Sequence, residues 1–339
     1  MDFDLTDVQR SWRDKAQALG RKLPEDAAAA DVVMGAARVG LIDPEADLIA
    51  ASLAVEALAS QSAAAGMTLA LHTTTLLARL RQGSGGHAFE SVVEALVRGE
   101  AVGALALSSE DVPAIENGHL TGRASWVGPI TGQGVALVGA RHGSHVTACA
   151  VALDAHGVHA TEVRTSALRG VVWAHVMFAC TPCLAAMETT SIMARARTLI
   201  SAVALGIGNR ALRESLAVVR REHGAGGEQT VQGLLADTAT ELAAARVLTW
   251  KAASAGAHVS LAAASMAKLA ATTAAQAAVV RATQVVGADS FRRGHVIEQL
   301  TQDVRAIELF AGRTESLREA VADAELPPLG RQSAVGGRQ

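Results

Sequence analysis

The chain has 339 residues, of which 50% are apolar and 19% are charged, and its formal net charge is −3. This composition excludes a disordered chain and predicts a sizeable buried core. Because no basic stripe interrupts the charge balance, nucleic acid and membrane surfaces are not expected partners. The acidic start lacks the pattern of a secretory signal, and no apolar stretch reaches the roughly 20 residues that cross a bilayer. We therefore expect a cytoplasmic protein.

Residues 1–100 are expected to form an α-helical domain. Thr6 and Gln9 have the spacing of a capping box, in which each side chain bonds the other residue's backbone N–H. Apolar residues recur at helical spacing, and another short helix is expected over about 88–98. The Gly-rich loop at 83–86 follows a helical pattern rather than a strand, so it is not expected to bind phosphate.

Residues 101–185 change to short runs rich in Val, Thr, His and Gly, separated by turn signals such as Asn117-Gly118. The expected strands are AVGALAL, HLTGRASWV, GVALVGA, HVTACAVAL and VVWAHVMF. Runs of this length predict one small antiparallel barrel or sandwich, and not a parallel sheet with crossover helices.

The cysteines lie in this β segment: Cys149 stands alone, and Cys180 and Cys183 form one Cys-Thr-Pro-Cys motif. A thioredoxin-like motif needs a strand followed by a helix, and a zinc site needs a second ligand pair, although His175 lies nearby. We expect buried thiols at strand ends without a disulfide framework, with redox or metal use as the alternative.

Residues 186–325 are expected to form a helical bundle, and residues 326–339 a flexible tail. Long helices are predicted over about 229–257, 260–286 and 294–324. The Ala-rich faces permit close helix packing, and so broad an Ala surface predicts contacts with other subunits.

In this order the segments resemble the acyl-CoA dehydrogenase family over nearly the full length. GRASWVG, which contains Trp126, is similar to the family strand that ends in Trp-Ile-Thr, whose Trp and Thr contact the flavin ring. LRGVVWAHVMFACTPC resembles the strand that closes the β domain. The resemblance implies a mainly α fold with a central β domain: an N-terminal helical domain, a small antiparallel barrel or sandwich, and a C-terminal four-helix bundle.

In the bundle, VVRREHG resembles the family's Arg-x-Gln-Phe-Gly turn, and it puts Arg220 where the family's Arg reaches a neighbour's FAD pyrophosphate. The fixed guanidinium fork suits a bidentate phosphate contact. QVVGADSF and LFAGRTES follow in family order. Besides Trp126 and Arg220, the resemblance implies cofactor contacts from Ser108, Gln284, Gly287, Gly312 and Thr314.

The family's catalytic carboxylate has no counterpart. In the family a Glu removes the α-proton of a CoA thioester while a hydride passes to the flavin, and this Glu precedes the Gly of a late Glu-Gly-Thr motif. That position is Ala311, and the alternative position of the base, directly before the bundle's Arg, is Ala196. We therefore expect no catalytic residue and no ordinary dehydrogenation by this chain alone. Glu308 and Glu315, one turn to either side, are more typical of surface residues.

The flavin contacts differ from the family as well. Thr-Glu-Pro appears as Ser108-Ser109-Glu110, Trp-Ile-Thr ends in Gly128, and the Gly-Gly-x-Gly-Tyr turn reads GADSF. Three outcomes for FAD stay open: weak binding, binding only at an interface shared with a partner, or no binding. Trp126 also has a second interpretation, because a Trp that ends a strand is often a core residue.

Three functions stay open. The first is a base-less subunit that works on acyl-CoA with a homologous catalytic subunit, or with copies of itself in a dimer or tetramer. The family includes heterotetramers in which one subunit type lacks the base and FAD lies between unlike chains, often serving steroid or side-chain CoA thioesters. The second is a flavin-dependent enzyme with altered chemistry, such as a monooxygenase. The third is a non-catalytic scaffold that no longer binds FAD.

Overall fold

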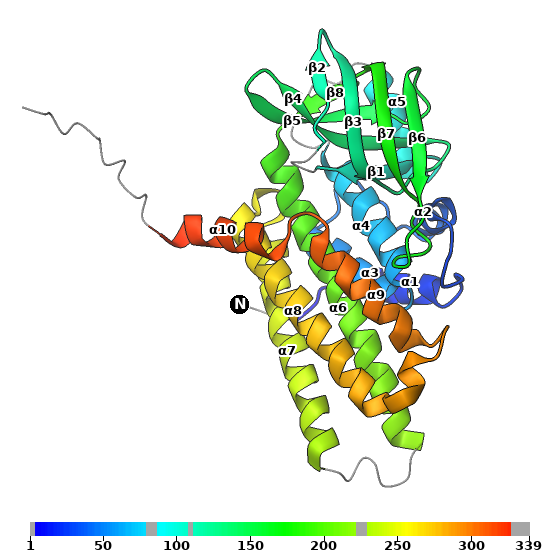
Figure 1. Cartoon of the computed structure of the whole chain (residues 1–339), viewed down its shortest axis with the longest axis vertical. Helices are drawn as coiled ribbons and strands as arrows, with labels where there is room; N and C mark the ends of the chain where they lie inside the picture. Colours follow the sequence, from blue (N-terminus) through cyan, green and yellow to red (C-terminus); the bar gives the residue numbers. More distant parts are fainter. Residues whose placement is uncertain (1–3, 79–86, 108–110, 222–228, 327–339) are drawn as a thin grey trace, which may run out of the picture.

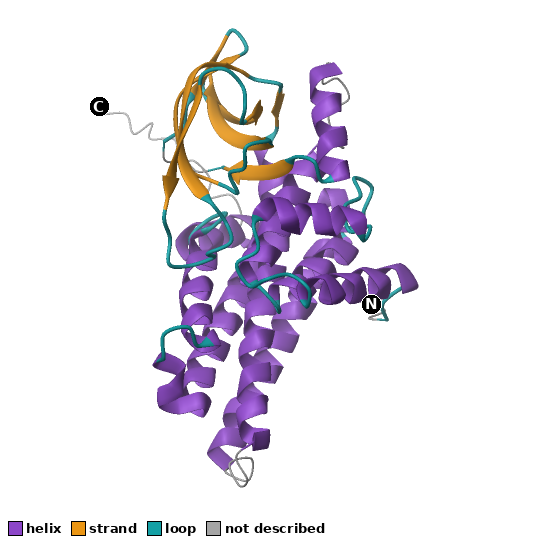
Figure 2. Ribbon diagram, turned by 90° about the vertical axis from the view of Figure 1, so that its right-hand side faces the viewer, coloured by secondary structure: helices purple, strands orange, loops and turns teal. Residues whose placement is uncertain are grey.

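The computed structural model describes residues 4–78, 87–107, 111–221 and 229–326. In these residues a helical segment, a β segment and a second helical segment follow one another (Figure 1). Figure 2 shows the curved sheet seated on one end of the long helices. The predicted fold class is confirmed.

The first segment contains five helices: α1 (Asp7–Gly20), α2 (Ala29–Arg38), α3 (Leu48–Ala59), α4 (Ala63–Leu77) and α5 (His87–Arg98). The capping box at Thr6 and Gln9 is confirmed, because each side chain accepts the other's backbone N–H. The short helix expected over about 88–98 is also confirmed, as α5. The Gly-rich loop at 83–86 lies outside the described residues.

α4 joins this segment to the sheet. All of its side chains are buried, as a helix in the centre of a core requires. The Gly103 backbone N–H donates to Nδ1 of His72 at 3.0 Å, and the Thr75 hydroxyl donates to the Ala104 carbonyl at 3.0 Å. Gly103 allows this close approach, since a Cβ there would lie 2.7 Å from Cβ of Thr75.

The sheet has eight strands: β1 (Val102–Ala106), β2 (Ala114–Glu116), β3 (His119–Val127), β4 (Gly134–His142), β5 (His145–Ala152), β6 (Val158–Val163), β7 (Trp173–Pro182) and β8 (Ala185–Met187). Its order is β6-β7-β3-β2-β4-β5-β8, and β1 pairs with β4. The pairings are antiparallel except for those of β1 and β2 with β4, so the expected purely antiparallel sheet needs this correction. Asn117 and Gly118 turn β2 into β3 with positive φ at both residues, as a two-residue hairpin requires.

The expectation of buried, unpaired thiols is wrong. β8 pairs with β5 and brings Cys183 onto Cys149, and the two form a disulfide with their Cα atoms 5.9 Å apart. Cys180 is the free cysteine of the three, and it is exposed rather than buried. Sequence spacing could not predict this pair, because the two residues meet only through the β5–β8 ladder.

The second helical segment contains α6 (Thr189–Arg221), α7 (Gln229–Ser254), α8 (Leu261–Val286), α9 (Val296–Leu309) and α10 (Thr314–Glu325), with short 3₁₀ turns η3 (Gly256–His258) and η4 (Gly287–Phe291). The single helix expected over 294–324 is wrong. Ala311 and Gly312 have φ of 55° and 114°, so the chain leaves the helical conformation there. As a result α10 crosses the bundle instead of continuing α9 (Figure 1).

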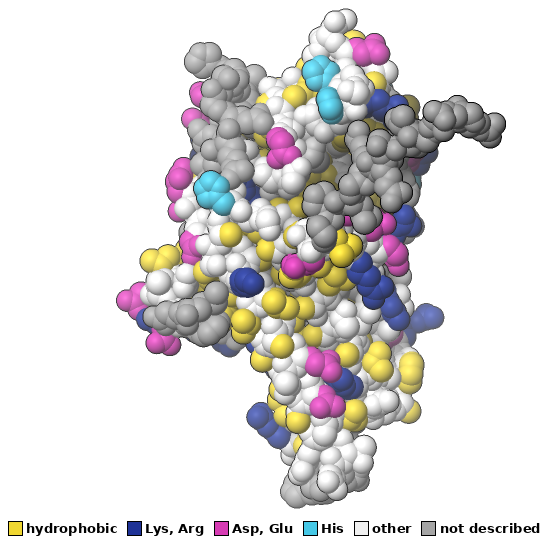
Figure 3. Space-filling view, turned by 90° about the vertical axis from the view of Figure 1, so that its left-hand side faces the viewer, with side chains coloured by type: hydrophobic (Ala, Val, Ile, Leu, Met, Phe, Trp, Pro, Cys, Tyr) yellow, Lys and Arg dark blue, Asp and Glu magenta, His cyan; other side chains and the backbone are white. Residues whose placement is uncertain are grey.

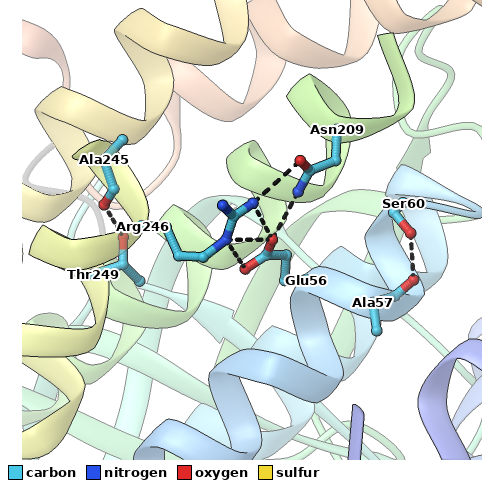
Figure 4. Close-up of polar contacts among 7 residues, drawn as sticks. All are labelled: Glu56, Ala57, Ser60, Asn209, Ala245, Arg246 and Thr249. Atoms are coloured by element: carbon cyan, nitrogen blue, oxygen red, sulfur yellow. Dashed lines mark hydrogen bonds and ion pairs between the residues drawn. The ribbon is translucent and has the colours of Figure 1, made fainter. Parts of the chain in front are cut away.

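The helical bundle packs closely against the first helical segment along α3 and α6. A Cβ at Gly206 would lie 2.5 Å from Cβ of Ala59, so glycine lets the two helices approach closely. Beside this contact, Glu56 accepts from Arg246 at 2.8 Å and from Asn209 at 2.7 Å (Figure 4). Such a bidentate pair orients α3, α6 and α7 relative to one another.

Among the residues that the structure describes, one helix, α6, is long and apolar enough to cross a membrane by length and composition alone. However, 89% of its most apolar window is buried inside the protein. This is the pattern of a core helix, and it is weak evidence for a membrane span.

Two buried groups give opposite pH dependences of stability. Complete burial lowers the pKa of His72 to about 4, against a smaller opposing effect of its hydrogen bond to the Leu96 backbone. Burial raises the pKa of Asp303 to about 6, although the Leu168 N–H and the Gln299 amide donate to its carboxylate. As pH falls below 6.5, the unfolded state binds the His72 proton first and stability decreases, whereas Asp303 binds its proton in the folded state and stability increases.

We therefore predict the effect of His72→Asn, which keeps an acceptor near the Gly103 N–H and removes the titration. The stability advantage of wild type over this variant is expected to shrink by about 2 kcal/mol between pH 7 and pH 5. Urea unfolding of both proteins at the two pH values measures it. An advantage that does not change with pH would mean that His72 is not held neutral by burial.

Candidate functional site

Trp126 ends β3 as an exposed platform. Its side chain is 47% exposed, and its φ of 58° is a left-handed conformation that costs a non-glycine residue about 1–2 kcal/mol. The strain arises at a β-bulge, where Ser125 and Trp126 lie opposite the single residue His175 of β7. The His175 ring packs edge-on against the indole with ring centres 5.8 Å apart. The bulge thus turns the indole out of the core, and the core interpretation of Trp126 is wrong.

The neighbouring position, Gly128, cannot carry a side chain. A Cβ there would lie 2.3 Å from the ring of Trp173, which is 2% exposed. Trp173 in turn stacks on Phe310 with ring centres 4.3 Å apart. The space that a Thr side chain would need is therefore filled by an aromatic pair that joins β7 to the end of α9. Trp126 could supply an aromatic surface for a flavin ring. Gly128 has no hydroxyl group that could donate a hydrogen bond to it.

Two buried cationic side chains, from α6 and α8, clamp the loop between α9 and α10. Arg197 of α6 donates to the Ala311 carbonyl at 2.9 Å, and Lys268 of α8 donates to the carbonyls of Gly312 at 2.6 Å and Glu308 at 3.1 Å. Gly312 is required beside them, because a Cβ would lie 2.9 Å from Nη2 of Arg197. These contacts satisfy carbonyls that the end of α9 leaves without helical partners.

Burial, together with the nearby charge of Arg197, lowers the pKa of Lys268 to about 7, against the opposing charge of Glu308. The amine is completely buried and holds backbone carbonyls. Its position and bonds therefore make it a loop anchor.

Neither position of a family base offers a carboxylate. Ala196 is fully buried in α6, and Ala311 lies on the clamped loop. Glu308 is occupied, because Thr314 donates to one of its oxygens at 2.9 Å and Gln276 donates to the other at 2.7 Å. Burial raises the pKa of Glu308, but these hydrogen bonds and the charge of Arg305 outweigh it and hold the pKa below its usual value. Such a carboxylate is a weak proton acceptor at neutral pH.

The remaining predicted cofactor residues do not gather around Trp126. Arg220 and Gln284 are exposed near the C-terminal ends of α6 and α8, and Gly287 follows α8 with a φ of 72°. These helix ends lie at the far end of the bundle from the sheet (Figure 1). Within one chain, Gly128, two residues after Trp126, reaches the α9–α10 loop through Trp173 and Phe310. Arg220, Gln284 and Gly287 lie at the other end of the bundle. Ser108 lies outside the described residues.

Four residues of this site were not predicted as site residues from the sequence: Trp173, Phe310, Lys268 and His175. A lysine inside an otherwise uncharged helical run was a signal for Lys268, since a buried lysine needs partners. The aromatic pair had no local signal, because its members are far apart in the sequence. Among the described residues, no group of three His, Cys, Asp or Glu could hold a metal ion.

The steric coupling between Gly128 and Trp173 predicts non-additive stabilities. Gly128→Ala in wild type is expected to destabilise the fold by about 2 kcal/mol or more, because its methyl group meets the Trp173 ring. In a Trp173→Leu background the same change is expected to cost at least about 1 kcal/mol less. A double-mutant cycle of urea unfolding measures this coupling. Additive changes in the free energy of unfolding would contradict this coupling, because they would show that the Trp173 ring moves aside at no cost.

Comparisons with known proteins match this geometry to one family. Residues 185–326 match the model of the acyl-CoA dehydrogenase C-terminal domain. A curated protein, the 3-sulfinopropanoyl-CoA desulfinase of Paraburkholderia xenovorans (strain LB400), is 36% identical over 125 residues, or 35% of this chain. The matched part spans 32% of that relative.

Solved structures extend the likeness of the fold to the whole chain. The butyryl-CoA dehydrogenase of Megasphaera elsdenii has a TM-score of 0.84 at 18% identity, with 96% of this chain and 99% of that chain covered. A glutaryl-CoA dehydrogenase of Mycobacterium smegmatis in complex with FADH2 has a TM-score of 0.83 at 15% identity, with 94% and 95% covered. Residues 185–326 therefore match the C-terminal domain of acyl-CoA dehydrogenases, and the chain as a whole has the fold of solved acyl-CoA dehydrogenases.

Proposed function

We propose that this chain is a base-less subunit of an FAD-dependent oxidoreductase that acts on CoA thioesters, in which a homologous chain supplies the catalytic carboxylate. The observation that carries the proposal is the α9–α10 loop. Arg197 and Lys268 hold this loop in place, yet it carries Ala311 where the resemblance puts the base, and the alternative position carries the buried Ala196. A positioned base contributes roughly 10²–10⁴ in rate, so losing it from both positions makes the chain depend on a partner.

The split of the predicted cofactor residues supports a shared site. Trp126 would offer its exposed indole to a planar ring on one side of an interface. Arg220 and Gln284, at the other end of the bundle, would hold the phosphates of a cofactor bound mainly by the partner. FAD, when bound, supplies the acceptor for a hydride. The chain's own residues supply orientation and charge, and the partner supplies the proton acceptor.

A second candidate is a reaction of a CoA thioester that needs no base at these positions. It is favoured by the 36% identity over 125 residues to a protein named 3-sulfinopropanoyl-CoA desulfinase. Breaking the C–S bond of such a thioester leaves the electron pair on carbon, which takes up a proton, and releases SO2, which water converts to sulfite. A colorimetric assay detects the sulfite. Sulfite release by the purified chain alone would favour this candidate over the paired subunit.

The first test of the paired subunit is the visible absorption spectrum of the chain, purified alone and co-expressed with a relative from the same genome that carries the Glu. We expect a flavin spectrum in the co-purified complex and none in the chain alone. Flavin bound to the chain alone would favour a flavin-dependent enzyme with altered chemistry. Absence of flavin from both samples would favour a non-catalytic scaffold that no longer binds FAD.

The role of Arg220 predicts a second result in that complex. Arg220→Lys keeps the charge but loses the guanidinium fork, so we expect FAD to bind about 10-fold more weakly. The adjacent exposed Arg221 provides a matched control, and Arg221→Lys should leave FAD binding unchanged. FAD titration followed by flavin fluorescence measures both variants. Equal affinities would contradict the phosphate contact.

A further inference from the structure

Two histidines face each other at the end of the β4–β5 hairpin. The ladder between β4 and β5 keeps one register along its whole length, and its last pair is His142 and His145. The turn residues Gly143 and Ser144 join them, and the φ of 61° at Gly143 is the positive value that a two-residue turn needs at its first position. The turn therefore fixes the two histidines as a directly opposite pair.

The geometry of this pair suits a shared ion. Directly opposite residues of an antiparallel ladder point to the same face of the sheet, and their Cβ atoms lie about 5 Å apart. A transition-metal ion holds imidazole nitrogens at about 2.0–2.1 Å, so two nitrogens on one ion lie about 3 Å apart. Because each imidazole extends several ångströms beyond its Cβ atom, rotation of the two side chains brings one nitrogen of each ring to this separation.

The two imidazoles are free to turn toward an ion. Both His142 and His145 are exposed, and neither makes a hydrogen bond, an ion pair or a ring contact with another described residue. Figure 3 shows histidine side chains on the surface at the sheet end of the molecule. The neighbouring Arg141 lies on the opposite face of β4, because successive side chains of a strand alternate, so its charge points away from the pair.

The backbone beside the pair is held in place on both strands. Next to His142, the backbone N–H of Arg141 donates to the Pro113 carbonyl at 2.8 Å. Next to His145, the Val146 carbonyl accepts from the Thr189 hydroxyl at 3.0 Å. An ion that binds here meets two ligands on a backbone that is already ordered, which lowers the entropic cost of binding.

We propose that His142 and His145 form a chelating site for one divalent transition-metal ion. Imidazole is a good ligand for Zn²⁺, Ni²⁺ and Cu²⁺, whereas Mg²⁺ and Ca²⁺ prefer oxygen ligands. Among divalent first-row ions the affinity of a nitrogen site is highest for Cu²⁺, so Cu²⁺ is the ion that the pair binds most tightly.

The number of protein ligands defines the kind of site. Structural zinc sites use four protein ligands and catalytic zinc sites use three. Among the described residues no third His, Cys, Asp or Glu joins His142 and His145 in a group that could hold a metal. The remaining positions on the ion are therefore open to water or to a ligand from solution. This site contains none of the residues of the proposed function, and it depends neither on FAD nor on the missing base.

The test is a calorimetric titration of the full chain, without an affinity tag, with Cu²⁺ and separately with Mg²⁺. We expect one Cu²⁺ per chain and no binding of Mg²⁺. His142→Asn and His145→Asn each leave a single imidazole, so each is expected to weaken Cu²⁺ binding about 10-fold or more. His159→Asn is the matched control, because His159 is an exposed histidine of β6 that lies opposite Met177. The control should keep the wild-type affinity.

Electron paramagnetic resonance of bound Cu²⁺ gives a second measurement that a change in folding would not imitate. The wild type should show two imidazole nitrogens on the ion, and each single variant should show one. Circular dichroism of the metal-free proteins should give the same secondary structure for the wild type and all three variants, because the three histidines are exposed.

One Cu²⁺ per chain that both single variants weaken, with His159→Asn unchanged, supports the proposal. The absence of saturable binding with a Kd below about 100 µM overturns it. Binding that survives either single variant also overturns it, and so does binding that His159→Asn weakens to the same extent. Failure of the proposed function is read separately, from the flavin spectrum.

Discussion

The clamp on the α9–α10 loop is the constraint on which the arrangement of the other parts depends. The last carbonyls of α9 have no helical N–H groups to accept from. Arg197 and Lys268 reach them from two different helices, and Gly312 leaves the room that the guanidinium needs. The loop therefore ends α9 and starts α10 at a fixed place.

The same clamp ties the sheet to the bundle. Phe310 enters the loop and stacks on Trp173, the first residue of β7, and the Trp173 ring in turn covers Gly128. A few residues further back on α9, Asp303 accepts from the backbone N–H of Leu168 in the loop before β7. Two independent contacts thus hold one end of β7 against α9.

This arrangement explains how the fold can persist without its chemistry. The groups that hold the loop are Arg197, Lys268, Ser265 and backbone carbonyls, and none of them is the proton acceptor of the family. Under the proposed function, Ala311 at the position of a base removes rate and leaves this packing intact. A subunit of this kind would keep its fold while another chain carries out proton transfer.

The sequence by itself predicted the three segments, the resemblance to acyl-CoA dehydrogenases and the Ala residues at both positions of the family's base, because each depends on local features: helical period, strand length, turn residues and short motifs. The tertiary structure decided what local features cannot encode. Residues from β7 and α9 form the aromatic pair beside Gly128, the β5–β8 ladder brings Cys183 onto Cys149, and two positive-φ residues break the helix expected over 294–324. The sequence predicted cofactor residues in both the β segment and the bundle, and the fold places Arg220 and Gln284 far from the sheet, because each lies about 35–45 Å along its own helix, α6 or α8.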